Sequence, residues 1–125
     1  MNPHNNLDYL AAKHAQALVK ANEKAKDLEN TLTKTLGVLQ ENGVYACFLY
    51  LYAGEKRKGS EIIAKMLALL KELQFPDPPE ESTGSQAVLE YVAKQITEDL
   101  HRLLPAKEAL EQMLIYARYG AKAQA

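Results

Sequence analysis

Residues 44–52, with the sequence VYACFLYLY, limit the possible folds of this chain more than any other stretch. As a strand the stretch would be apolar on both faces, so it would have to lie at the centre of a sheet. No other segment offers a partner strand, because the remaining candidates are rich in Ala, Leu, Lys and Glu with a period of about 3.6 residues. A single buried strand would leave its backbone groups unpaired. We therefore predict a buried central helix over about 44–54, with Gly43 as the left-handed residue that ends the preceding helix.

Apolar residues recur at helical spacing on both sides of this central segment. The sequence therefore predicts an all-α fold, a compact single-domain bundle of five to six helices that covers residues 1–125. Two helices are expected before the central one, with a bend between Asn22 and Asn30 and with Asn6 or Asp8 as the first cap. A chain of 125 residues is long enough to bury one hydrophobic core.

An acidic, proline-rich loop at 75–85 divides the C-terminal half of the chain. Ser60 is the predicted N-cap of the helix before this loop, and Thr83 has capping-box spacing to Gln86 for the helix after it. The core face of that later helix is expected to carry Leu89, Val92, Ile96, Leu100 and Leu103. Pro105 either opens a sixth helix at its first position or kinks one long helix. The tail at 120–125 is predicted to fray.

The composition is that of an ordinary globular protein, with 47% apolar residues, 25% charged residues and a net charge of -1. Any binding to nucleic acid must therefore depend on a local patch of bases. The single cysteine, Cys47, excludes an internal disulfide and suits the reducing cytoplasm, and its apolar neighbours predict a buried structural thiol. Neither a signal peptide nor a run of about 18 apolar residues is visible, so we expect a cytoplasmic protein with no membrane contact.

The sequence contains no recognisable catalytic or metal-binding motif. His4, His14 and His101 lack the close spacing of metal ligands, and His14 lies on an apolar helix face that is typical of a hydrogen-bonded core histidine. Phosphate-binding loops and nucleophile motifs are absent. We therefore expect no enzyme activity, no metal, no cofactor and no small-molecule substrate.

Lysines along the first helix form one candidate binding surface. Lys13, Lys20 and Lys24 are seven and four residues apart, which places them in a narrow strip at about 100° per residue. Such a strip could follow a phosphate backbone. A solvated helix edge with extended lysine side chains would have the same spacing.

A second candidate surface is the basic cluster Lys56, Arg57 and Lys58, which has a glycine on each side. The flanking glycines predict a short loop, in which three adjacent bases can contact one anionic path. A solubilising turn is the alternative interpretation. Arg118 and Lys122 share one face of the last helix because they are four residues apart.

Two segments resemble the small helical subunit of the Cmr (type III-B) CRISPR–Cas effector complex. The first is LGVLQENGVYACFLYLYAGEKRKG at 36–59, in which a helix ends at Asn42-Gly43, an apolar helix follows and a basic turn comes last. The second is EDLHRLLPAKEALEQMLIYARYGAKA at 98–123, which is similar to the closing helix of that family. The two matches together cover about 50 of the 125 residues.

The resemblance implies a non-catalytic structural protein that works in antiviral defence. In that family, copies of the small subunit stack as a filament beside the subunits that carry the guide RNA. Their basic faces follow the duplex of guide RNA and target RNA and stabilise the bound target without reading its sequence. Carried over by position, Lys56, Arg57 and Lys58 match the basic turn of the family, and Arg118 matches the base in its closing helix.

A helical protein–protein adaptor with no nucleic-acid role is the alternative hypothesis. Residues 76–100 hold six acids and one base, so this part of the chain forms an acidic side that could contact a protein partner. The adaptor hypothesis predicts that the basic turn is dispensable and that the acidic side makes the main contact.

Overall fold

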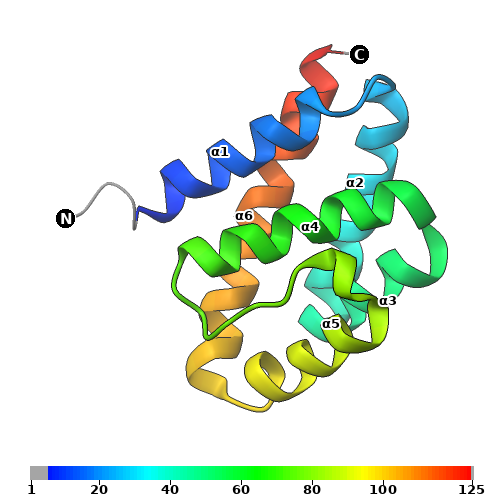
Figure 1. Ribbon diagram of the computed structural model, residues 1–125. Coiled ribbons are helices and arrows are strands. Elements are labelled where there is room, and N and C mark those ends of the chain that lie inside the picture. The colour runs from blue at the N-terminus through cyan, green and yellow to red at the C-terminus, as the bar shows by residue number, and fades with distance from the viewer. Residues whose placement is uncertain (1–5, 125) are drawn as a thin grey trace.

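The computed structural model describes residues 6–124 except for the side chain of Lys56, and helices account for most of these residues (Figure 1). The α-helices are α1 (Leu7–Lys20), α2 (Ala25–Asn42), α3 (Val44–Gly54), α4 (Lys56–Glu72), α5 (Ser85–Tyr91) and α6 (Leu100–Gln124). A 3-10 turn, η2 (Glu81–Thr83), precedes α5, and a π-helical segment, η3 (Val92–Thr97), continues it. The described residues contain no strand, which confirms the predicted all-α bundle.

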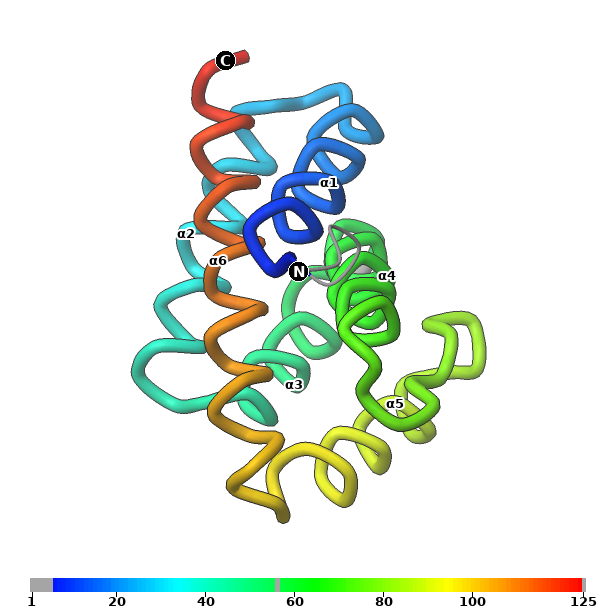
Figure 2. The backbone as a smooth tube through the Cα atoms, turned by 90° about the vertical axis from the view of Figure 1, so that its left-hand side faces the viewer, coloured from blue at the N-terminus to red at the C-terminus, as the bar shows by residue number. Residues whose placement is uncertain are grey.

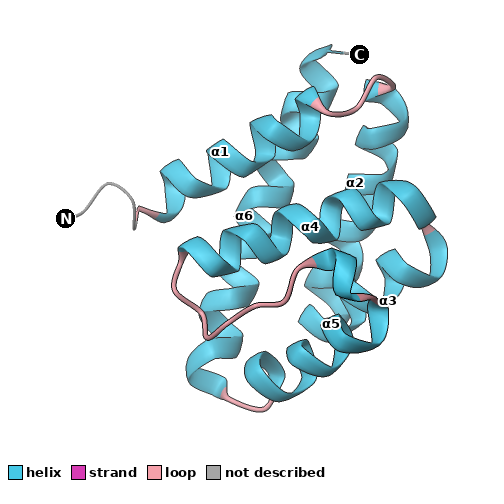
Figure 3. Cartoon of the chain, in the orientation of Figure 1, coloured by secondary structure: helices cyan, strands magenta, loops and turns pink. Residues whose placement is uncertain are grey.

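The helices form two crossing layers. Helices α2 and α6 pack against each other in one layer, and α1 and α4 lie side by side across α6 in the second (Figures 1 and 2). Helix α3 contacts α2, α4, α5, η3 and α6, so it holds the predicted central position. The one long loop, between α4 and α5, crosses the outside of the bundle (Figure 3). None of the helices at 6–124 is long and apolar enough to cross a bilayer.

Helix α3 is buried along one face only. Val44, Cys47, Phe48 and Leu51 are inside the core, where each large apolar side chain contributes about 1.5–3 kcal/mol by leaving water. The opposite face of α3 is open, and Leu49 on it is exposed. The prediction of a central helix is therefore confirmed, although this helix is not covered on all sides.

Gly43 connects α2 to α3 as a single-residue junction. Its φ of 100° and ψ of -176° lie in an extended, positive-φ region that is essentially restricted to glycine. The predicted left-handed helical conformation at this position is wrong, because that conformation needs a ψ of about +47°. The prediction that α2 ends here and α3 starts at once is confirmed.

Three predicted helix starts have different outcomes. Asn6 caps α1, since its Oδ1 accepts hydrogen bonds from the backbone N–H groups of Asp8 at 2.9 Å and Tyr9 at 3.4 Å. Ser60 is not an N-cap, because α4 already begins at Lys56. The predicted capping box before α5 is also wrong, since Gly84 holds the cap position and the Thr83 hydroxyl instead donates to the carbonyl of Glu80.

The last helix begins earlier and ends later than the sequence indicates. Asp99 caps α6, because its Oδ1 accepts from the backbone N–H of His101 at 2.9 Å, and Pro105 therefore lies inside the helix. Leu100 is 69% exposed, so the expectation that it lines the core is wrong. Helix α6 continues to Gln124 and Ala121 is buried; Ala125 lies outside the described residues, and fraying of the tail stays a prediction.

Candidate nucleic-acid interface

The basic cluster lies in the first turn of α4 rather than in a loop. Helix α4 begins one residue after α3 ends, with Glu55 as the junction, so Arg57 and Lys58 are helical. The Glu55 side chain makes no capping bond to α4. Its carboxylate instead accepts hydrogen bonds from the Thr31 hydroxyl at 3.1 Å and the Tyr50 hydroxyl at 3.0 Å. Glu55 thus joins α2 and α3 at the residue from which α4 starts, and its bond to Thr31 is a long-range contact at this junction.

The close approach of α4 to α3 explains the glycine after the basic residues. A Cβ atom on Gly59 would lie 2.4 Å from the backbone oxygen of Leu51 in α3. No other residue fits at this position without moving one of the two helices. Gly59, which the sequence places at the end of a predicted short loop, therefore lies inside α4 and serves helix packing.

Placing bases in the first turn of α4 is electrostatically unfavourable for the helix itself. The N-terminus of a helix carries a partial positive charge, so acidic residues stabilise it and basic residues destabilise it by about 0.3–1 kcal/mol each. Arg57 and Lys58 add to the positive potential of the free backbone N–H groups at the same end. This arrangement does not favour folding, but it favours the binding of an anion such as a phosphate group.

Lys24 from the turn between α1 and α2 lies in the same hollow as these two bases. The hollow has a volume of about 520 Å³. Its lining consists of Ala21, Asn22, Glu23, Lys24, Asp27, Arg57, Lys58 and Glu61. We call the three bases in it, Lys24, Arg57 and Lys58, the basic corner.

Acidic residues share this hollow and limit its positive charge. Arg57 Nε lies 3.6 Å from Glu61 Oε1, yet the Arg57 side chain is 94% exposed and keeps most of its guanidinium available. Glu61 is held in place by Asn22, whose side-chain amide donates to Glu61 Oε2 at 3.2 Å and to the carbonyl of Leu18 at 2.9 Å. With Glu23, Asp27 and Glu61 the lining has as many acids as bases, so the hollow has no net positive charge and only the exposed bases are available to an anion.

The predicted lysine strip along the first helix is not continuous. Helix α1 ends at Lys20, so Lys24 belongs to the following turn and joins the basic corner instead. Lys13 forms an ion pair with Glu72, with its Nζ at 3.0 Å and 3.2 Å from the two carboxylate oxygens. Lys20 lines a different hollow, between α1 and α6. The structure therefore brings only one of the three lysines to the basic corner.

The bases of α6 lie apart from the basic corner as well. Arg118 and Lys122 are on the same helix, as predicted, and the Arg118 guanidinium lies 5.5 Å from the centre of the Tyr119 ring. Neither base lines the hollow of the basic corner. The side chain of Lys56 lies outside the description, so no position is assigned to it.

His14 is the hydrogen-bonded core histidine that its apolar helix face predicts. It is buried, and its Nε2 lies 2.7 Å from Glu72 Oε1. Burial lowers the pKa of His14 below its usual value of 6.5, and the neighbouring Glu72 only partly offsets that effect. Burial would raise the pKa of Glu72, but hydrogen bonds from Lys13 and His14 outweigh it and hold this pKa below its usual value. The group is a structural contact between α1 and α4.

The described residues contain no group of side chains arranged to bind a metal ion. Cys47 is buried, and burial raises the pKa of its thiol to about 12, so it remains protonated and unreactive as predicted. His101 is exposed, and His4 lies outside the described residues.

Sequence reasoning missed the two features that organise the corner. Lys24 is 33 positions before Arg57, and only the packing of the α1–α2 turn against α4 brings them together. The bond from Thr31 to Glu55 also joins residues that are far apart in the sequence. Glu55 stands directly before the basic cluster, and this adjacency was the only local signal.

Comparisons with protein families, curated proteins and solved structures found nothing that matches this chain.

Proposed function

We propose that this chain is a non-catalytic structural subunit of a type III CRISPR RNA-guided effector complex in the cytoplasm. In this role it stacks with copies of itself and with other subunits of the complex. It stabilises the duplex of guide RNA and target RNA through contacts to the phosphate backbone, which carry no sequence information. The all-α fold with a central helix fits the segments that resemble the Cmr small subunit.

The observation that carries the proposal is the position of Arg57 and Lys58 in the first turn of α4, with Lys24 beside them. Bases at the positive end of a helix weaken folding, so another function must account for them. A row of phosphate groups would bring negative charge to the exposed side of these bases, in addition to the three carboxylates that line the same hollow.

A triple charge reversal tests the proposal. Lys24→Glu, Arg57→Glu and Lys58→Glu should together weaken target-RNA binding by the assembled complex. The slope of log K against log salt should fall by about one for each phosphate contact that is lost. Two targets of unrelated sequence, each with its own guide, should lose affinity by the same factor because backbone contacts do not depend on sequence.

The matched control carries the same change of charge away from the basic corner. Lys34→Glu, Lys71→Glu and Lys107→Glu alter residues that do not line the hollow, so this variant should bind target RNA nearly as well as the wild type. Equal RNA binding by the wild type and the corner variant, at every salt concentration, would show that the basic corner does not contact RNA.

The adaptor hypothesis is favoured by a different observation. Leu100 and Leu104, four residues apart at the start of α6, are 69% and 64% exposed. Apolar side chains that stand together in water are typical of protein–protein contacts. An adaptor should tolerate the corner variant and lose assembly with its partner subunits on Leu100→Ser with Leu104→Ser. Co-purification of both variants with the other subunits separates the two functions.

A further inference from the structure

A groove between α1 and α6 is a second hollow on this protein, separate from the basic corner. It has a volume of about 710 Å³. Its floor is made of small residues, since Ala12 and Ala15 come from α1 and Gly120 comes from α6. The helices approach closely here, because a Cβ atom on Gly120 would lie 3.2 Å from a methyl carbon of Val19. A second helix could therefore come near the backbone of α1.

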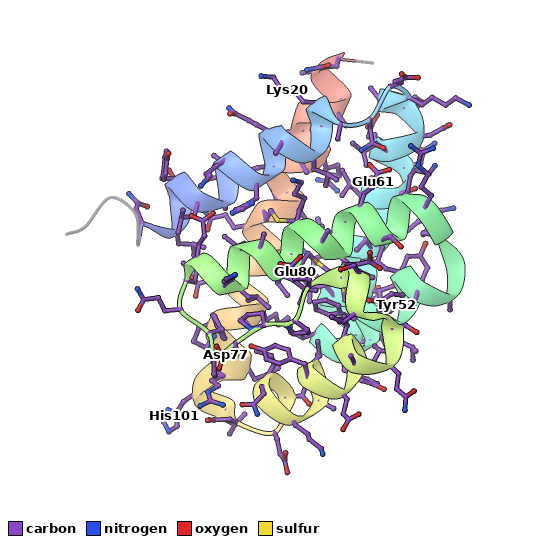
Figure 4. The ribbon with its side chains drawn as sticks, viewed as in Figure 1. Lys20, Tyr52, Glu61, Asp77, Glu80 and His101 are labelled. Carbon is purple, nitrogen blue, oxygen red and sulfur yellow. The ribbon has the colours of Figure 1, made fainter. Side chains whose placement is uncertain are left out.

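The two ends of the groove carry opposite charges. Asp8 lies in the first turn of α1 and Lys20 in its last turn, so the charges are separated by twelve residues, or about 18 Å along the helix. Asp8 Oδ1 accepts hydrogen bonds from the Tyr116 hydroxyl and from Gln112, but among the described side chains no base pairs with Asp8. Lys20 likewise has no acidic partner among them. Figure 4 shows Lys20 at the end of α1 beside the C-terminal part of α6.

The surface of α1 along the groove is complementary to itself. Asp8, Ala12, Gln16 and Lys20 are spaced four residues apart and follow one strip of the helix. In chain order, these four side chains are acidic, small, amide and basic. A second copy of α1 that runs antiparallel presents base, amide, small and acid. Each charge then faces its opposite, and each small residue faces the longer Gln16.

We propose that the chain pairs with a second copy of itself through α1 and the C-terminal part of α6, antiparallel about a twofold axis between Ala12 and Gln16. Asp8 of each copy then lies opposite Lys20 of the other. A twofold contact forms every interaction twice, so two weak ion pairs and two Ala12–Gln16 contacts add up.

Two exposed tyrosines beside the strip support a protein partner. Tyr9 on α1 is 53% exposed and Tyr119 on α6 is 59% exposed. Tyrosine is enriched at protein interfaces, because its ring buries a large apolar area while its hydroxyl stays hydrogen-bonded. In the antiparallel arrangement Tyr9 of one copy comes near Val19 of the other, beside which Gly120 lies. A partner of unrelated sequence would need a base opposite Asp8 and an acid opposite Lys20, whereas a second copy of the chain supplies both.

The pairing goes beyond the proposed function and does not depend on it. The groove and the basic corner share no lining residue. The pairing is measured on the isolated protein, whereas RNA binding is measured on the assembled complex. Failure of one proposal therefore leaves the other standing.

Sedimentation equilibrium of the full chain tests the pairing. The wild type should show a monomer–dimer equilibrium that stops at the dimer and weakens as salt increases. Lys20→Glu places two acids opposite each other at both ends, so the dissociation constant should rise by about tenfold or more. Asp8→Lys should have the same effect by placing two bases opposite each other. The double variant Asp8→Lys with Lys20→Glu exchanges the charges and should restore dimerisation to near the wild-type value.

The control is Lys34→Glu, an exposed position on α2 that should leave the dissociation constant unchanged. Circular dichroism shows whether the variants of Asp8 are folded, and Lys20→Glu tests the contact without disturbing a described hydrogen bond or ion pair. A wild type that stays monomeric up to about 1 mM would overturn the proposal, since that limit corresponds to negligible affinity. Growth beyond the dimer, or a folded double variant that dimerises no better than the single variants, would also overturn it.

Discussion

Replacing Gly59 with alanine should destabilise the protein, although Gly59 lies inside a helix, where alanine is normally favoured by about 1 kcal/mol. The added Cβ atom would lie 2.4 Å from the carbonyl oxygen of Leu51 and 3.3 Å from the Cβ atom of Glu55. The closer atom belongs to the backbone of α3, so relief requires the two helices to separate. Overpacking of this kind costs about 1–3 kcal/mol, and the upper end is appropriate for a backbone atom. The expected net loss of unfolding free energy is therefore about 2 kcal/mol.

Urea unfolding followed by far-UV circular dichroism measures this loss. Gly37→Ala is the matched control, because Gly37 also lies inside a helix and a Cβ atom there would meet nothing within 4 Å. The control should gain about 1 kcal/mol, so the two alanine variants should differ by about 3 kcal/mol. A Gly59→Ala variant as stable as the wild type would refute the close approach of α4 to α3, and with it the placement of the basic corner.

Three further measurements test the interior. The unfolding free energy should fall as pH decreases below about 6.5, because His14 has a lowered pKa in the folded state and the unfolded chain then binds more protons. His14→Gln should flatten this part of the plot of unfolding free energy against pH, measured by urea unfolding. An unchanged plot would assign the pH dependence to another group. Tyr52→Phe should raise the unfolding free energy by about 1 kcal/mol in the same assay, because the buried hydroxyl has no hydrogen-bond partner among the described side chains. A loss of stability would mean that it has one. A thiol reagent should modify Cys47 only on unfolding, since its pKa is about 12, and rapid modification of the folded protein would contradict its burial.

The helical character of the chain could be predicted because it depends on periodicity, which is a local property. The central helix followed from the absence of any partner strand, and the structure confirms it at Val44–Gly54. The identity of its buried face was harder to predict. A helix that is apolar all round has no preferred side in the sequence, and only its neighbours determine that Phe48 is buried while Leu49 is exposed.

The basic corner could be predicted only in part, because its geometry comes from contacts between distant residues. The sequence places Arg57 and Lys58 next to each other, but it does not show that Thr31 and Tyr50 donate to Glu55 or that α4 begins directly after it. It also places Lys24 on the wrong surface, since helical spacing cannot show that α1 stops at Lys20.

The order of the helices has a consequence for the synthesis of the protein. Helix α6 is the last element of the bundle along the chain, yet it supplies the surface on which both α1 and α2 pack (Figure 2). Leu10 and Leu28 therefore have no complete core to enter until Leu110 and Leu114 have left the ribosome. Until then the first helices can pack only against one another and leave the apolar faces that α6 covers exposed, so we expect the complete core to form only after α6 has been synthesised.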